Sequence, residues 1–215
     1  MKKKKIGVLI SGGGSNLQAL IEACAAADYP AEISVVISNK ESAYGLNRAR
    51  EHHIPAHIIN HKDYETREAF DDAMHTLLMH HQVDIVCLAG FMRLLSPAFV
   101  KRWQDRMLNI HPSLLPAFKG AHAHEDVLAS GVRFSGCTVH FVRPEMDSGP
   151  VIVQAVVPVL PQDTLETLAA RVLEQEHRIY PLALRWLAEG RLSVSGNKVM
   201  VKSAKAADGA LINPL

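Results

Sequence analysis

Three short apolar runs, separated by helical patterns, constrain the fold of this chain more than any other feature. The runs at Lys5–Ile10, Ile33–Ser38 and Val83–Ala89 are rich in valine, isoleucine and leucine, and apolar residues recur at helical spacing after each of them. Strands that are continuously apolar are typical of a parallel sheet covered on both faces. The alternation therefore predicts an α/β fold, a mostly parallel twisted sheet with helices on both faces and right-handed crossovers.

The second half of the chain predicts an antiparallel addition to this sheet. Turn residues separate four more apolar runs, at Phe134–Val142, Val151–Val159, Arg191–Val194 and Lys198–Val201. Asp163 is expected to cap a long helix that reaches Glu189 and is interrupted at Pro181, because proline removes a helical hydrogen bond. The helices between the earlier strands are predicted at residues 43–53, 64–81, 97–103 and 124–130.

A glycine-rich loop, Ser11–Asn16, joins the first strand to a helix that begins near Ser15 or Asn16, both good N-caps. A strand, a glycine loop and a helix N-terminus together present free N–H groups to an anion, in the manner of a Rossmann-like fold. The dinucleotide fingerprint fails, because Leu17 stands at its third glycine, and no Walker sequence is present. A single phosphomonoester is favoured over the alternative, a plain tight turn.

The segment Met107–His111 is a predicted strand that ends at Pro112. Asn109 and His111 then share one face, while the leucine and isoleucine between and beside them point into the core. An imidazole can exchange protons near neutral pH, and an amide can donate a hydrogen bond to an oxygen that gains charge. The pair therefore suits acyl transfer; taken alone, a capping asparagine and a packed histidine are the alternative.

A turn-rich loop from Arg143 to Pro150 contains Asp147. If Asp147 reaches the histidine of the strand, its carboxylate would stabilise the protonated imidazole and hold its orientation. A plain turn role is the alternative for this residue. His122 and His124 form an H-x-H pair, but no third ligand is suitably spaced, so we expect no metal.

Charge and composition exclude several classes of function. The formal net charge is +1, and the only basic block is Lys2–Lys5, so we expect no nucleic-acid partner. No apolar run is long enough to span a membrane, and the first is too short for a signal peptide, so we expect a cytoplasmic protein. Cys24, Cys87 and Cys137 are too far apart for a zinc site or a disulfide framework and are expected to be buried.

Five blocks of the sequence resemble the folate-dependent phosphoribosylglycinamide (GAR) formyltransferases of purine biosynthesis. They follow the family's order between about Ile6 and Arg191, and they are Ile10–Gln18, Leu88–Pro97, Asn109–Pro116, Met146–Pro150 and Gln175–Pro181. The chain departs from the family's pattern at Gly13, Lys119 and Arg143-Pro144. The resemblance implies the formyltransferase fold and transfer of the formyl group of 10-formyltetrahydrofolate to the amine of GAR.

The resemblance also implies roles for individual residues. It makes Asn109, His111 and Asp147 the catalytic trio, with His111 as the acid that handles proton transfer. GAR would be bound by the phosphate loop and by a ribose-binding acid: Gly14, Ser15, Asn16 and Glu176. Folate would contact Asn109 and also Arg67, Met92, Arg93, Leu94, Leu95 and Val142.

We expect one domain over residues 1–215, with a mononucleotide-binding half (1–104), a catalytic and folate-binding half (105–203) and a flexible tail (204–215). The expected partners are the two small-molecule substrates, with no metal, nucleic acid or membrane, and the chain is expected to be a monomer or homodimer.

A formyltetrahydrofolate deformylase on the same scaffold is one alternative function, since Leu115–Ala121 resembles that family as well. That family and methionyl-tRNA formyltransferase have additional domains that we do not expect here. The other alternative is a non-catalytic protein that binds a phosphorylated metabolite.

Overall fold

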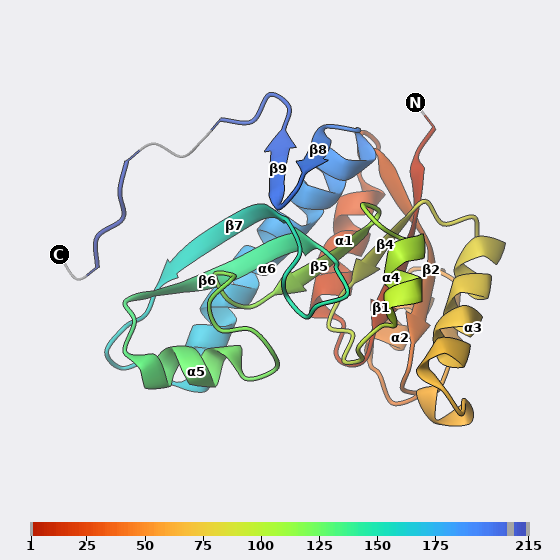
Figure 1. Ribbon diagram of the computed structural model, residues 1–215, viewed down its shortest axis with the longest axis horizontal. Coiled ribbons are helices and arrows are strands. Elements are labelled where there is room, and N and C mark those ends of the chain that lie inside the picture. Colours follow the sequence, from red (N-terminus) through yellow and green to blue (C-terminus); the bar gives the residue numbers. More distant parts are fainter. Residues whose placement is uncertain (1, 206–208, 214–215) are drawn as a thin grey trace.

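The protein folds around a single nine-stranded sheet with helices on both faces (Figure 1). The structure is a computed structural model that describes residues 2–205 and 209–213. The strand order is β3-β2-β1-β4-β5-β6-β7-β9-β8. Neighbouring strands from β3 to β5 are parallel, whereas β6 pairs antiparallel with both β5 and β7. The predicted α/β class, with its antiparallel addition in the C-terminal half, is confirmed.

The strands lie close to their predicted positions. Their bounds are β1 Lys4–Ile10, β2 Ala31–Ser38, β3 Ala56–Ile58, β4 Ile85–Leu88, β5 Met107–His111, β6 Phe134–Phe141, β7 Val151–Pro158, β8 Leu192–Ser195 and β9 Lys198–Val201. The helices are α1 Ser15–Ala25, α2 Gly45–Glu51, the 3-10 turn η1 His61–Asp63, α3 Arg67–His80, α4 Pro97–Arg102, α5 Ala123–Ser130 and α6 Leu165–Ala188.

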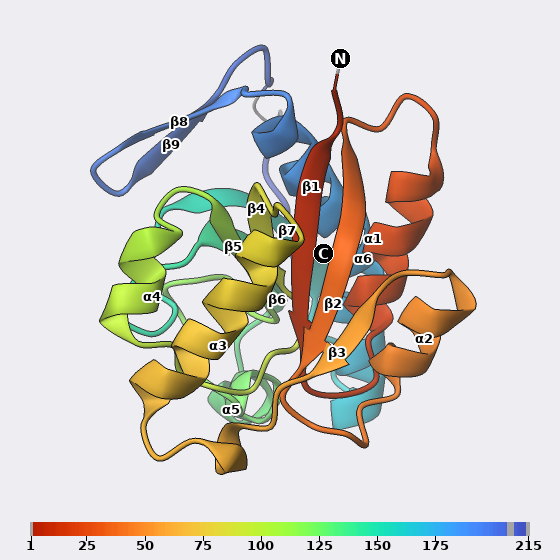
Figure 2. The ribbon, with the colours of Figure 1, turned by 90° about the vertical axis from the view of Figure 1, so that its right-hand side faces the viewer.

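Two hydrophobic cores occupy the two faces of the sheet. Figure 2 shows α3 and α4 on one side of the parallel strands, with α1, α2 and α6 on the other. Alternate residues of β1 divide between the cores: Val8 and Ile10 pack toward α1 and α6, and Leu9 packs toward α3 and α4. The strands are apolar at successive positions because both of their faces are buried.

Strand β5 shows the alternation that the sequence predicted. Leu108 and Ile110 belong to the core beneath α1 and α6, whereas Met107 belongs to the core beneath α3 and α4. Asn109 and His111 therefore share the face of Met107, at the carboxyl end of the strand. This register places an amide and an imidazole side by side on rigid backbone.

Helix α6 differs from its prediction in two ways. Thr164, not Asp163, is the N-cap, and its side chain accepts from the Thr167 amide in a capping box. Asp163 instead forms a salt bridge of 2.7 Å with Arg171. The helix also continues through Pro181, since the single hydrogen bond that proline removes costs less than burying the helix's apolar stripe gains.

Local capping corrects the predicted start of α3 and the predicted cap of α1, whose predicted start near Ser15 is confirmed. Helix α3 begins at Arg67 rather than near Tyr64, because the Thr66 side chain accepts from the Ala69 amide. Helix α1 begins at Ser15, but its cap position is Gly14, in the left-handed region at φ 72°, with no side-chain cap. A glycine occupies that position because other residues resist a positive φ.

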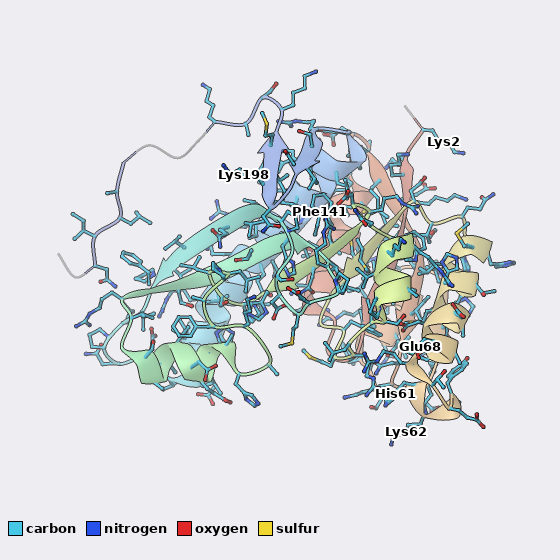
Figure 3. The ribbon with its side chains drawn as sticks, in the orientation of Figure 1. Lys2, His61, Lys62, Glu68, Phe141 and Lys198 are labelled. Atoms are coloured by element: carbon cyan, nitrogen blue, oxygen red, sulfur yellow. The ribbon has the colours of Figure 1, made fainter. Side chains whose placement is uncertain are left out.

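The final strands, β8 and β9, form an antiparallel hairpin and also join the sheet. Lys198, labelled in Figure 3, begins β9 and pairs in parallel with Val151 of β7. Among the described helices, none combines the length and the apolar character that a membrane crossing requires. The predicted flexible tail, 204–215, includes residues 206–208 and 214–215, which lie outside the described residues.

Candidate active site

Two adjoining cavities open at the carboxyl ends of the parallel strands. The strand order reverses between β1 and β4, and open α/β sheets bind ligands at such a switch point. The smaller cavity, of about 220 Å³, is lined mainly by the glycine loop Ser11–Asn16. The larger, of about 410 Å³, lies beside it over β5 and β6, and both share Gly90 and Met92 as lining residues.

The glycine loop is shaped to expose backbone N–H groups at the start of α1. Gly14 takes φ 72° and its carbonyl accepts from the Gln18 amide, so the helix begins directly after the loop. The first amides of a helix have no intrahelical partner, and the helix dipole adds positive potential there. Gly14, Ser15 and Asn16 all line the smaller cavity, which fits an anion the size of a phosphate.

Helix α2 holds this loop from behind. The Gly45 amide donates to the Gly12 carbonyl over 3.1 Å, and Arg48 Nε donates to the Gly13 carbonyl over 2.9 Å. The backbones approach so closely that a Cβ on Gly14 would lie 2.7 Å from Gly45 Cα. Carbonyls bound on the far side leave the amides of the loop turned toward the cavity.

Asn16 connects the loop to a buried acid on α6. Its Nδ2 donates to Glu176 Oε2 over 2.6 Å, and its buried Oδ1 has no partner among the described residues. Burial raises the pKa of Glu176, and the hydrogen bond from Asn16 opposes that shift. An unpaired buried oxygen beside a buried carboxyl group provides acceptors for ligand hydroxyl groups.

The three predicted catalytic side chains converge at the larger cavity. His111 Nδ1 lies 3.5 Å from Asp147 Oδ2, and both side chains are largely buried. His111 Nε2 lies 2.9 Å from the Phe118 carbonyl, which can only accept, so this nitrogen bears a proton. Asp147 Oδ2 also accepts from the Gly120 amide over 3.0 Å. Both nitrogens of His111 thus face oxygen atoms, an arrangement that suits an imidazolium.

His140 is a fourth side chain in this group, and the sequence reasoning did not assign it to the site. It lies opposite Asn109 in the antiparallel register of β5 and β6, and its Nε2 is 3.2 Å from Asn109 Nδ2. Burial lowers the pKa of His140, which favours the neutral ring. Since His140 Nδ1 donates to the Phe141 carbonyl, Nε2 accepts from the Asn109 amide and fixes its orientation. Asp147 Oδ1 is 3.8 Å from the same Nε2.

Most of the residues predicted to contact folate line the larger cavity. It is bounded by Met92, Arg93, Leu94, Leu95, Asn109 and Val142, among others. Met92 and Leu94 are exposed apolar side chains that can cover a flat ring system. Arg67, at the start of α3, is not among the lining residues, and its contact with folate remains a prediction.

Ser11 joins the two cavities through hydrogen bonds. Its amide donates to the Gly90 carbonyl over 3.1 Å, and its hydroxyl accepts from the Met92 amide over 2.8 Å. The same hydroxyl donates to Asn39 Oδ1 over 2.6 Å. The glycine loop and the loop after β4 therefore form one connected wall.

The H-x-H pair is divided between two environments. His122 is exposed and forms an ion-pair contact of 2.7 Å with Glu125. His124 is partly buried, and burial together with the charge of His111 lowers its pKa. Within residues 2–205 and 209–213, no group of three or more His, Cys, Asp or Glu side chains is arranged to hold a metal ion.

Comparisons with known proteins agree with this geometry. The family model described as formyl transferase matches residues 4–184. A phosphoribosylglycinamide formyltransferase from Haemophilus influenzae is 46% identical over 194 residues, which cover 90% of this chain and 92% of that protein. The crystal structure of glycinamide ribonucleotide transformylase 1 from Symbiobacterium toebii superposes with a TM-score of 0.92 at 49% identity, covering 94% of this chain and 95% of that one.

Longer proteins contain a similar segment. The trifunctional purine biosynthetic protein adenosine-3 of Chironomus tentans is 53% identical over 190 residues, or 87% of this chain. This chain spans only 14% of the length of that curated relative.

Proposed function

This chain belongs to the formyl transferase family, and from that premise we propose that it transfers the formyl group of 10-formyltetrahydrofolate to the amine of GAR. The products are formyl-GAR and tetrahydrofolate, and the reaction belongs to purine biosynthesis. The main support from the structure is the convergence of Asn109, His111 and Asp147 at a cavity that adjoins the glycine loop. Family membership implies a folate-type cosubstrate.

In this proposal GAR occupies the smaller cavity. Its phosphate binds the amides of Gly14, Ser15 and Asn16 at the start of α1. Its ribose hydroxyl groups bind Glu176 and the unpaired Oδ1 of Asn16. The glycine amine then extends past Gly90, where the two cavities meet, toward His111. Positioning of this kind replaces a bimolecular encounter with an oriented one.

The folate occupies the larger cavity, with its formyl group next to Asn109. The neutral amine of GAR attacks the formyl carbon, and the carbonyl oxygen gains negative charge. The side chain of Asn109, held by His140, and the imidazolium of His111 stabilise that oxygen. The tetrahedral intermediate loses a proton from the amine nitrogen while N10 of folate gains one and leaves.

Asp147 supports His111 in this scheme and orders a water molecule for the proton transfer. Its carboxylate is within 3.5 Å of His111 and is itself held by the Gly120 amide. The reaction needs no electron transfer, since the formyl carbon moves from one nitrogen to another.

In the same proposal residues 1–104 bind the nucleotide, and residues 105–203 supply catalysis and the folate site. The enzyme is cytoplasmic and is a monomer or homodimer.

The test is the consumption of 10-formyltetrahydrofolate, followed by absorbance with and without GAR. Consumption that depends on GAR, with formyl-GAR as product, is expected. Equal consumption in the absence of GAR would replace the proposal with a deformylase. No consumption in either case, together with binding of GAR, would leave a non-catalytic phosphometabolite-binding protein.

A further inference from the structure

The loop of residues 142–150 connects β6 to β7 and brings Asp147 to the active site. Phe141, labelled in Figure 3, is the last residue of β6 before this loop. Asp147 has a φ of 50°, an unfavourable value for a residue with a Cβ. The position of its carboxylate therefore depends on how firmly the loop is held.

Both ends of the loop are fixed by the sheet. At its start, the Val142 amide donates to the Met107 carbonyl over 2.9 Å. At its end, Gly149 packs so tightly that an added Cβ would collide with the Phe141 carbonyl oxygen. In the middle, Ser148 Oγ donates to the Glu145 carbonyl within the loop itself, and the Gly120 amide donates to Asp147 Oδ2.

One ion pair links the loop to a separate turn of the protein. Arg143 lies 2.6 Å from Asp105 Oδ1 through one terminal nitrogen, and its other terminal nitrogen donates to the Val142 carbonyl over 3.1 Å. Asp105 belongs to the turn between α4 and β5 and has a φ of 57°. Among the described residues, this is the only salt bridge from residues 143–146 to the rest of the chain.

We propose that Arg143 and Asp105 are positioning residues, which we name the loop strut, that hold residues 143–148 in the conformation that binds the folate cosubstrate. This inference rests on the proposed function. Arg143, Pro144 and Met146 line the larger cavity, and Asp147 reaches His111 from the same loop. A guanidinium that bonds its own backbone and a distant carboxylate at once fixes the direction in which the loop leaves β6.

Partial burial makes the strut more than an ordinary surface ion pair. The Arg143 side chain is 22% exposed and that of Asp105 is 43% exposed, so water screens the attraction only in part. Pro144, which directly follows Arg143, further limits the backbone freedom of the loop. Without the strut, the loop would sample other conformations. The apparent affinity for folate would then fall, because only a fraction of the molecules would have the conformation that binds it.

The experiment compares Arg143→Ala, Asp105→Gly and the double variant in two measurements. The first is hydrogen exchange of the backbone amides of residues 143 and 145–148 in the free protein, and the second is KM for each substrate. Asp105→Gly is informative because glycine accepts a φ of 57° without strain, so the turn itself should not be destabilised. Asp28→Asn, which removes the charge from the ion pair between Asp28 and Arg185 of α6, is the control.

We expect each single variant to exchange the loop amides about 3- to 10-fold faster and to raise KM for 10-formyltetrahydrofolate by roughly the same factor. The KM for GAR should stay within about twofold, and the double variant should match the single ones, because both remove the same interaction. Asp28→Asn should change neither measurement.

Two results would overturn the loop strut. An effect of Arg143→Ala without an effect of Asp105→Gly would mean that Arg143 contacts the ligand directly. Unchanged exchange in both variants would mean that the pair does not hold the loop. If the wild-type chain transfers no formyl group, the proposed function fails, while the exchange measurement still decides whether the pair orders residues 143–148.

Discussion

The glycine loop and the larger cavity, the proposed catalytic site, lie side by side but are built in opposite ways. The glycine loop, Ser11–Asn16, is one continuous segment that presents backbone amides at the start of α1, and α2 secures it through bonds to its carbonyls. The larger cavity presents side chains from β5, β6 and the loop 142–150, which are distant in sequence and meet through the antiparallel register of β5 and β6.

Because of this difference, the two regions should tolerate different kinds of substitution. A site made of backbone should be sensitive to changes of conformation and insensitive to most changes of side chain that leave φ and ψ intact. A site made of side chains should show the reverse, with large losses when one functional group is removed. Substitutions at four positions test this contrast, in order of decreasing effect on the kinetics.

Replacing His111 by Ala should give the largest effect. The loss of the imidazole should lower kcat by roughly 10²- to 10⁴-fold, because the proton transfer and the charge that stabilises the intermediate are both removed. The KM for GAR should change by less than about threefold, since the glycine loop is untouched. Steady-state kinetics check both values, and a kcat within tenfold of wild type would contradict the catalytic role.

Replacing Gly14 by Ala should act on the other region. An alanine at φ 72° costs about 1–2 kcal/mol, and its Cβ would lie 2.7 Å from Gly45 Cα, so the loop must shift. We expect KM for GAR to rise by about tenfold or more, with a smaller change in kcat. Gly13→Ala is the matched control, because a Cβ there meets no atom within 4 Å. Equal effects of the two variants would show that backbone strain is not the cause.

Replacing His140 by Gln should lower kcat by roughly tenfold, because the flexible glutamine amide does not reproduce the fixed imidazole acceptor that orients the Asn109 side chain. The KM for GAR should again remain close to wild type. The comparison of kcat with His111→Ala and His140→Gln shows whether orientation of the amide contributes less than the acid itself. A variant as active as wild type would remove His140 from the site.

His140→Gln should also change how the free energy of unfolding depends on pH. Burial lowers the pKa of His140 below its usual 6.5, so the unfolded chain binds a proton at a higher pH than the folded protein does. The stability from neutral His140 is complete above about pH 6.5 and is lost as the pH falls through the folded pKa. One group contributes at most about 1.4 kcal/mol per pH unit. Urea unfolding at pH 7.5 and 5.5 should show a smaller loss for His140→Gln than for wild type.

Replacing Arg48 by Gln should give the smallest effect. Its guanidinium holds the Gly13 carbonyl, but the Gly45 amide still holds Gly12. We expect KM for GAR to rise by about threefold, with kcat unchanged, because one of two supports remains. A change in kcat larger than the change in KM would mean that α2 influences the larger cavity as well as the loop.

Local patterns in the sequence were sufficient for much of this structure. Continuous apolar runs predict buried parallel strands, and the alternation within Met107–His111 places Asn109 and His111 on one face; both features depend only on neighbouring residues. The loop Ser11–Asn16 is likewise a local feature, because its conformation follows from glycine and from the helix that begins after it.

Helix ends were less predictable, since several nearby residues can serve as caps. Thr164 rather than Asp163 caps α6, because Asp163 pairs with Arg171, eight residues away. The helix continues through Pro181, because the burial of residues such as Tyr180 and Leu184 is decided by packing against the sheet.

The sequence by itself determined the fold class, the glycine loop and the two polar residues of β5, because each depends on local conformation and on the period of apolar residues. Only the tertiary structure decided that His140 lies opposite Asn109, that Asp147 reaches His111, and that Arg143 pairs with Asp105. These contacts join residues 31 to 38 positions apart. Their physical cause is the register of antiparallel strands and the path of a loop, which local sequence does not specify.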